Sequence, residues 1–308
     1  MKIYNDIISP PKPLALALGF FDGLHKGHLS VIKNAAAQKA NGLLPAVFTF
    51  KSSPQSALSG KTVPRLITNE SRTVLMKESG IELLYEIDFS SVRNLSAEDF
   101  VKRLIHENLR AKKVFCGFNY HFGKGGAGNE KTLRSLCAAF GIEAFTAPPV
   151  IFGGTPISST RIRSAIESGS IKSANAMLGR RFSFDFTVSH GNELGRKMET
   201  PTINQPFPSG FILPRFGVYA SYAVIDGKAM KAVTNIGVKP TVGSDCPLAE
   251  TWILDGGIGS LYGKSPKIEL VEFIRPEKKF GSISELQSAI IHDGETAKNI
   301  LEIAAAAL

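Results

Sequence analysis

Short apolar runs alternate with segments of helical periodicity over the first 180 positions of this 308-residue chain. The apolar runs lie at 14–19, 45–50, 83–87, 113–116 and 143–145. Between them, apolar residues recur at helical spacing over 29–38, 71–78, 97–108 and 131–140. This alternation predicts an α/β domain with an open parallel sheet and helices on both of its faces.

The pattern changes after a further predicted helix at 170–178. From 181 to 275, runs of β-branched and aromatic residues such as 217–224 are separated by Gly and Pro, which favours a small all-β barrel. A helical pattern over 283–301 follows the barrel. We therefore expect two domains, residues 1–180 and 181–308.

Composition narrows the class of protein. The chain is 43% hydrophobic and 20% charged, as expected of a soluble globular protein, and its three cysteines (Cys116, Cys137 and Cys246) form no zinc-spaced cluster. We expect a reducing, cytoplasmic location with neither a disulfide framework nor a structural metal. The net charge of +9 favours anionic partners, but no basic stripe interleaved with aromatics and no membrane-length apolar run is present, so we expect neither nucleic acid nor membrane binding. Oligomeric state stays open.

Two histidines follow the first predicted strand. His25 and His28 flank Gly27 where a strand passes into a helix, which places both at the carboxyl edge of the predicted sheet. Glycines allow close approach of phosphate, and a helix N-terminus favours anions. Two imidazoles there can neutralise charge on a transferring phosphoryl group. The alternatives are turn glycines with surface histidines, or a metal site in which Asp22 is the one carboxylate at ligand spacing.

The sequence Gly-Phe-Phe-Asp-Gly-Leu-His-Lys-Gly-His at 19–28 resembles the HxGH signature of nucleotidyltransferases, in the version found in bacterial bifunctional riboflavin kinase/FAD synthetases. The resemblance implies that His25 and His28 stabilise the transition state at the α-phosphate of ATP. Residues 157–163 resemble the second superfamily signature, and 117–123 a segment that contacts nucleotide and flavin. The nucleotide-binding residues implied are Gly19, Phe20, Asp22, Gly23, Gly27, Asn119, Ser158, Ser159, Thr160, Arg161 and Arg163.

The predicted barrel carries a second resemblance. Residues 195–204 resemble the kinase motif of the same family, which ends Pro-Thr-Ala-Asn, and further matches follow in the family's order at 217–219, 235–241, 249–255 and 261–264. The resemblance implies a six-stranded barrel that phosphorylates riboflavin. Thr202 and Asn204 would offer oxygens to the Mg²⁺ that accompanies ATP, and Glu250 would be the general base. If each motif is considered alone, the alternative for the Pro-Thr-x-Asn segment is an ordinary turn, and the alternative for Glu250 is a solvated carboxylate.

Three positions depart from the family pattern: Ser53, where a histidine is usual; Glu199, where the family has glycine; and Trp252, where a histidine is frequent. We interpret Trp252 as a packing change near the flavin. The charged run of Arg275, Glu277, Lys278 and Lys279 is interpreted as solvated surface.

The predicted function is flavin cofactor synthesis: riboflavin and ATP give FMN, and FMN and ATP give FAD and pyrophosphate. One alternative is a riboflavin kinase with a weakened N-terminal module. Another is a non-catalytic flavin- or nucleotide-binding regulator.

Overall fold

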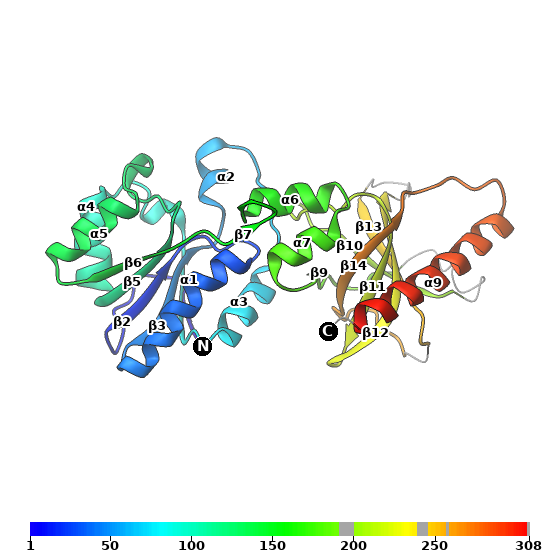
Figure 1. Cartoon of the computed structure of the whole chain (residues 1–308), viewed down its shortest axis with the longest axis horizontal. Coiled ribbons are helices and arrows are strands. Elements are labelled where there is room, and N and C mark those ends of the chain that lie inside the picture. The colour runs from blue at the N-terminus through cyan, green and yellow to red at the C-terminus, as the bar shows by residue number, and fades with distance from the viewer. Residues whose placement is uncertain (191–199, 239–245, 257–258, 307–308) are drawn as a thin grey trace. The chain divides into compact units, whose positions relative to one another are not determined.

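A computed structural model describes residues 1–190, 200–238, 246–256 and 259–306 (Figure 1). The chain forms two compact units. The first comprises Met1–Val63 and Asn69–Ser158, and the second comprises Pro64–Thr68 and Ser159–Leu308. Among the described residues, no helix is long and apolar enough to cross a membrane.

The first unit is built on a six-stranded, all-parallel sheet with the order β1-β4-β3-β2-β5-β6. The strands are β1 (Lys2–Tyr4), β2 (Leu14–Leu18), β3 (Leu44–Phe50), β4 (Leu83–Ile87), β5 (Ala111–Gly117) and β6 (Glu143–Ala147). This confirms the predicted parallel sheet and adds β1, an edge strand that the apolar pattern does not reveal.

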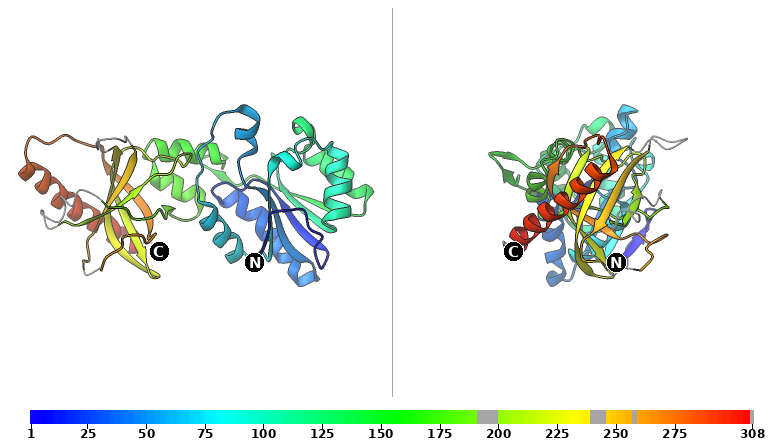
Figure 2. Two further views of the ribbon diagram at one scale, coloured as in Figure 1. Left: turned by 180° about the vertical axis from the view of Figure 1, so that it is seen from behind. Right: turned by 90° about the vertical axis from the view of Figure 1, so that its right-hand side faces the viewer.

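Helices cover both faces of this sheet, as predicted (Figure 2). On one face, Ala15 and Ala17 of β2 lie in the core cluster that includes Val31 and Ile32 of α1 (Lys26–Ala36), together with α3 (Asn69–Glu78). On the other face, the leucines of β2 pack with the helix over 97–108 and with α5 (Glu130–Ala139). The remaining elements are η1 (Ala37–Asn41), α2 (Pro54–Ser59), η2 (Phe89–Ser91), α4 (Ala97–Asp99), the π-helical η3 (Phe100–Asn108), η4 (Lys124–Gly126), α5 (Glu130–Ala139), β7 (Ile151–Phe152) and β8 (Thr155–Pro156).

The second unit holds a six-stranded antiparallel sheet with the order β10-β13-β12-β11-β14-β9. Beyond β9, the Ser189 N–H donates to the Asn204 carbonyl of β10 over 2.8 Å, so the chain following one edge strand reaches the other edge. Its elements are α6 (Ser159–Glu167), α7 (Ile171–Leu178), β9 (Phe182–Phe184), β10 (Thr202–Pro206), β11 (Gly217–Ile225), β12 (Lys228–Val238), β13 (Pro247–Ile253), β14 (Lys267–Arg275) and α9 (Ile283–Ala306). The predicted β-rich fold with a terminal helix is confirmed.

Helix α9 packs on one face of this sheet. Ala297 and Leu301 are fully buried in a cluster with Val218, Ala220 and Val233 of β11 and β12. The helix runs to Ala306, five residues beyond the predicted end. Within the same unit, the segment 64–68 pairs with the chain near 210: the Arg65 N–H donates to the Gly210 carbonyl over 2.8 Å.

Candidate functional site

The histidine loop lies at the point where the strand order of the parallel sheet reverses. The chain passes from β2 to β3 and β4 on one side, whereas β5 and β6 lie on the other side of β2. The loops after β2 and β5 therefore diverge from neighbouring carboxyl ends, which is where open α/β sheets bind ligands. These loops carry His25 and Asn119, so the topology brings two of the predicted sites to one edge.

His25 caps the N-terminus of α1. Its Nδ1 accepts a hydrogen bond from the His28 N–H at 3.3 Å, and the two imidazoles stack with ring centroids 3.6 Å apart. Because Nδ1 accepts, the neutral imidazole of His25 carries its proton on Nε2. The side chain is buried, with 5% of His25 exposed. Both rings thus lie at the positive end of the α1 dipole, a favourable place for phosphate.

The loop reaches this arrangement through a tight backbone path. Phe21, Gly23 and Leu24 all have left-handed φ angles, of 56°, 78° and 42°. Such conformations cost about 1–3 kcal/mol for residues other than glycine, so surrounding contacts must stabilise Phe21 and Leu24. At Gly19 a Cβ would lie 2.9 Å from the Phe21 ring, which explains the glycine there.

The second predicted nucleotide signature lies where the first unit ends and the second begins. Ser159, Thr160, Arg161 and Arg163 begin helix α6 of the second unit, whereas Ser158 ends the first unit. Arg163 Nε donates to the Pro64 carbonyl over 2.6 Å, within the second unit. The set inferred from the resemblance is therefore divided between the two units. Among the described residues, no group of three or more His, Cys, Asp or Glu side chains is arranged to hold a metal ion.

The second site lies on the antiparallel sheet. Asn204 of β10 is directly opposite Glu250 of β13, which is directly opposite Asn235 of β12. Residues opposite one another point to the same face, so these three polar side chains form a row across three strands. Thr202 lies two residues before Asn204 and is opposite Trp252, so it occupies the same face. The kinase-site residues predicted from separate motifs are thus neighbours.

Two oxygens at this site are buried without hydrogen-bond partners among the described residues: Thr200 Oγ1 and Asn204 Oδ1. Thr200 lies two residues before Thr202, just outside β10, and its side chain is buried. Burying a polar oxygen without a partner is costly, and such oxygens suit a hard cation. The residues therefore fit a magnesium site. Thr200 was missed from the sequence, where alternation with Thr202 and Asn204 was its only signal; Glu199 lies outside the described residues.

Helix α9 covers the face that carries Glu250. Val218 and Val233, which contact α9, share that face with Asn235 and Trp252 respectively. Trp252 reaches the helix itself, because a Cβ on Gly294 would lie 2.7 Å from Cζ3 of its indole. The interpretation of Trp252 as a packing residue agrees with this contact.

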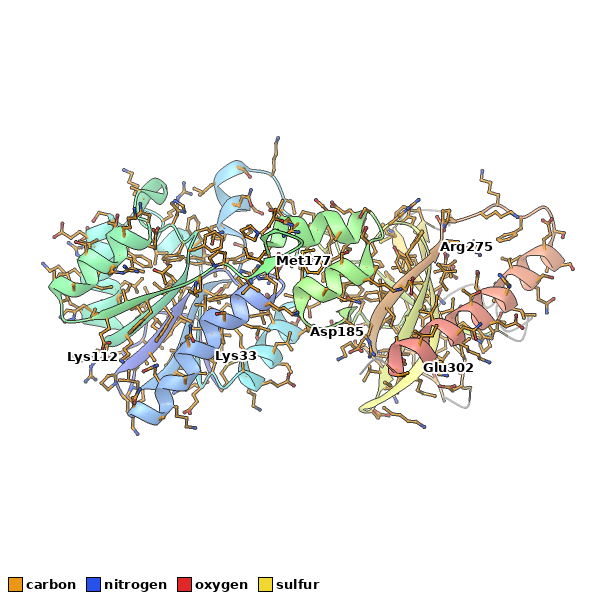
Figure 3. All side chains as sticks on the ribbon, in the orientation of Figure 1. Lys33, Lys112, Met177, Asp185, Arg275 and Glu302 are labelled. Atoms are coloured by element: carbon orange, nitrogen blue, oxygen red, sulfur yellow. The ribbon has the colours of Figure 1, made fainter. Side chains whose placement is uncertain are left out.

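Arg275 is the last residue of β14 and is labelled in Figure 3. It ties α9 to the sheet, because its Nε and Nη2 donate to the two carboxylate oxygens of Asp293, over 2.9 and 2.6 Å, and Asp293 is 3% exposed. The interpretation of Arg275 as part of a solvated run is therefore wrong. The partner lies on another element, so the local run of charges could not reveal it.

Comparison with known proteins extends through both units. Residues 8–161 match the family model of FAD synthetase, and residues 178–301 match that of riboflavin kinase. The chain is 34% identical over 290 residues to the bifunctional riboflavin kinase/FMN adenylyltransferase of Listeria monocytogenes, covering 92% of this chain and 91% of the relative. The protein of the same name from Bacillus subtilis is 35% identical over 297 residues, covering 92% and 90%.

A solved structure is also similar along nearly its whole length. It is described as a macrolide-efflux protein from Streptococcus pneumoniae, and it superposes with a TM-score of 0.87 at 30% identity, covering 97% of this chain and 98% of that chain.

Proposed function

The chain belongs to the family of bifunctional riboflavin kinase/FMN adenylyltransferases, and we propose how its two sites perform the two reactions. It phosphorylates riboflavin with ATP to give FMN, and it transfers the adenylyl group of ATP to FMN to give FAD and pyrophosphate. The observation that carries this function is the ordered pair of family matches, each of which coincides with one of the two candidate sites.

For the kinase reaction, Glu250 is the general base. It accepts the proton of the riboflavin 5′-hydroxyl as that oxygen attacks the γ-phosphorus of ATP and the bond to the β-phosphate oxygen breaks, releasing ADP. Thr202 and Asn204, with Thr200 beside them, would hold Mg²⁺, which neutralises the phosphate charge. Support comes from the face of the sheet that Thr202, Asn204 and Glu250 share, and from the buried oxygens of Thr200 and Asn204.

For adenylyl transfer, a phosphate oxygen of FMN attacks the α-phosphorus of ATP and pyrophosphate leaves. No proton has to be removed from this nucleophile, so the site contributes by stabilising the negative charge that develops at the α-phosphate in the transition state. His25 and His28 do this at the N-terminus of α1. Gly19, Phe20, Asp22, Gly23 and Gly27 shape the loop for nucleotide, and Asn119 contacts the nucleotide from the loop after β5. The hydroxyl and guanidinium groups of Ser158, Ser159, Thr160, Arg161 and Arg163 suit a triphosphate.

We further propose that residues 1–180 form the adenylyltransferase domain and 181–308 the kinase domain. The family matches end at 161 and begin at 178, which supports a division of the two functions close to this boundary, whereas the compact units divide after Ser158. A reducing cytoplasm stays a prediction from the cysteine pattern.

The test is direct. Purified protein given riboflavin, ATP and MgCl₂ should yield both FMN and FAD on chromatography, and omitting ATP or chelating magnesium should abolish both products. Protein given FMN, ATP and MgCl₂ should yield FAD. If riboflavin gives FMN but neither reaction gives FAD, the result would support the alternative of a kinase with a weakened N-terminal module.

A further inference from the structure

Arg72 of α3 is an arginine buried completely inside the first unit, where its side chain has no solvent exposure. Its Nη1 donates to the Phe20 carbonyl over 3.1 Å, and its Nη2 donates to the Phe50 carbonyl over 3.3 Å. The same Nη2 forms an ion pair with Glu86 of β4. One guanidinium therefore joins the histidine loop, the end of β3 and β4.

The Phe20 carbonyl receives a second hydrogen bond. Thr49 Oγ1, fully buried on β3, donates to it over 2.9 Å. The guanidinium carbon of Arg72 also lies 5.6 Å from the centroid of the Phe20 ring, within cation–π range. Phe20 is thus held by its carbonyl and by its ring, immediately before the left-handed turn of Phe21, Gly23 and Leu24.

Stability alone does not account for an arginine at this position. Met76, one turn later on α3, is fully buried against the sheet, so an apolar residue would suit the local packing at 72. Desolvating a guanidinium and a carboxylate is expensive, and replacing a buried ion pair by apolar side chains is often neutral or stabilising. An apolar residue cannot supply the N–H groups that bind the backbone of the histidine loop and of the end of β3.

We propose that Arg72 is a positioning residue for adenylyl transfer. Its guanidinium, together with the Thr49 hydroxyl, fixes the backbone of residues 20–24 in its strained path, and thereby fixes His25 and His28 where charge develops on the α-phosphate. This inference rests on the proposed function of the histidine loop. Arg72 acts through the histidines, because its side chain is buried and contacts the loop from inside the protein.

The experiment compares Arg72→Lys, Arg72→Met and Thr49→Val with the parent. Lysine keeps the charge but loses the planar fork, and valine keeps the shape of threonine but loses the donor. A displacement of about 1 Å in a reacting group can cost about 100-fold in rate. We expect kcat for FAD formation from FMN to fall at least about 10-fold in each variant, with the KM for ATP within about 2-fold.

Two readouts separate this proposal from a purely structural role. Riboflavin phosphorylation by the same samples reports that the second unit is intact, and it should stay within about 2-fold of the parent. Hydrogen–deuterium exchange of the peptide covering residues 19–28 should become at least about 10-fold faster in each variant, because the loop backbone loses an anchor. Arg103→Met is the matched control. Arg103 is an exposed arginine of the same unit, paired with Asp99 over 2.8 Å, and its loss should change neither readout.

Unchanged exchange of residues 19–28 in all three variants would overturn the proposal, even if the melting temperature falls. An unchanged kcat alongside faster exchange would overturn it as well, because the loop would then be mobile without consequence for the chemistry. If the parent itself makes no FAD from FMN, the proposed function has failed, and the exchange experiment still decides whether Arg72 anchors the loop.

Discussion

Asn204 and Glu250 lie directly opposite each other on the neighbouring strands β10 and β13. Opposite residues in an antiparallel pair have Cβ atoms about 4.5–5.5 Å apart, so the amide and the carboxylate can act on the same ATP and hydroxyl acceptor. Asn204 belongs to the Pro-Thr-x-Asn motif, whereas Glu250 lies in a distant segment of the sequence. The pairing of β10 with β13 brings the two residues together. Helix α9 packs on the same face of the sheet, and Arg275 fixes it there through Asp293.

Replacing Glu250 by glutamine should remove the general base of the kinase reaction while preserving the shape of the side chain. We expect kcat for FMN formation to fall about 10²–10⁴-fold, since that is the usual contribution of a positioned base. FAD formation from supplied FMN should stay within about 2-fold of the parent. Chromatographic rates for both reactions are the measurement. Glu272→Gln is the matched control on β14, where the carboxylate pairs with Lys172 over 2.7 Å, and it should leave both rates unchanged.

His28→Ala should impair FAD formation rather than FMN formation, the opposite of Glu250→Gln. Loss of one group that stabilises transition-state charge typically costs about 10²–10³ in kcat, so FAD formation from FMN should fall by that factor while riboflavin phosphorylation is spared. His106→Ala serves as the control, because His106 stacks on Phe140 at 5.1 Å, away from the histidine loop. If the Glu250 and His28 variants damage both reactions equally, the assignment of one reaction to each site is wrong.

The local patterns of the sequence predicted most of the fold because each element carries its own signal. The run Leu14–Leu18 is buried on both sides, as a central parallel strand must be, and it stands out in the sequence. Strand β1 was missed because it has three residues, two of them exposed, so it shows no apolar pattern. Helix α1 begins at Lys26 rather than at 29 because His25 caps it, and histidine is an uncommon capping residue.

The residues of the candidate sites also fall into those that the sequence predicts and those that it does not reveal. His28 and Glu250 were predicted because their motifs are continuous in sequence. Arg72 and Asp293 were missed because their partners are remote: Arg72 binds the carbonyl of a residue 52 positions away, and Asp293 binds a strand 18 positions away. A buried charged side chain has the same sequence signature as an exposed one, so only the fold reveals it.

Gly294→Ala should destabilise the second unit even though alanine is the better helix former. Alanine favours a helix interior by about 1 kcal/mol over glycine, but its Cβ would lie 2.7 Å from the Trp252 indole, and overpacking costs about 1–3 kcal/mol. We expect a net loss of about 1 kcal/mol in the free energy of unfolding, measured in urea. In a Trp252→Leu background the same substitution should stabilise instead. A loss of equal size in both backgrounds would show that the indole is not the cause.

The cysteines should differ sharply in reactivity. Burial raises the pKa of the Cys116 thiol to about 11 and that of the Cys137 thiol to about 12, whereas Cys246 is exposed. The thiolate is the nucleophile, so a raised pKa leaves a thiolate fraction of only about 10⁻³ or less at pH 8. We expect a disulfide reagent such as dithionitrobenzoate to titrate one thiol rapidly in the native protein at pH 8 and three in urea.

The pH dependence of the thiol reaction rates gives a second check on this assignment. Raising the pH from 8 to 9.5 increases the thiolate fraction of Cys116 and Cys137, but their pKa values stay above that range, so both should remain slow. Cys246→Ser should abolish the fast phase and leave the slow one unchanged. Two fast thiols in the parent, or a fast phase that survives Cys246→Ser, would contradict the burial of Cys116 and Cys137 in the sheet core of the first unit.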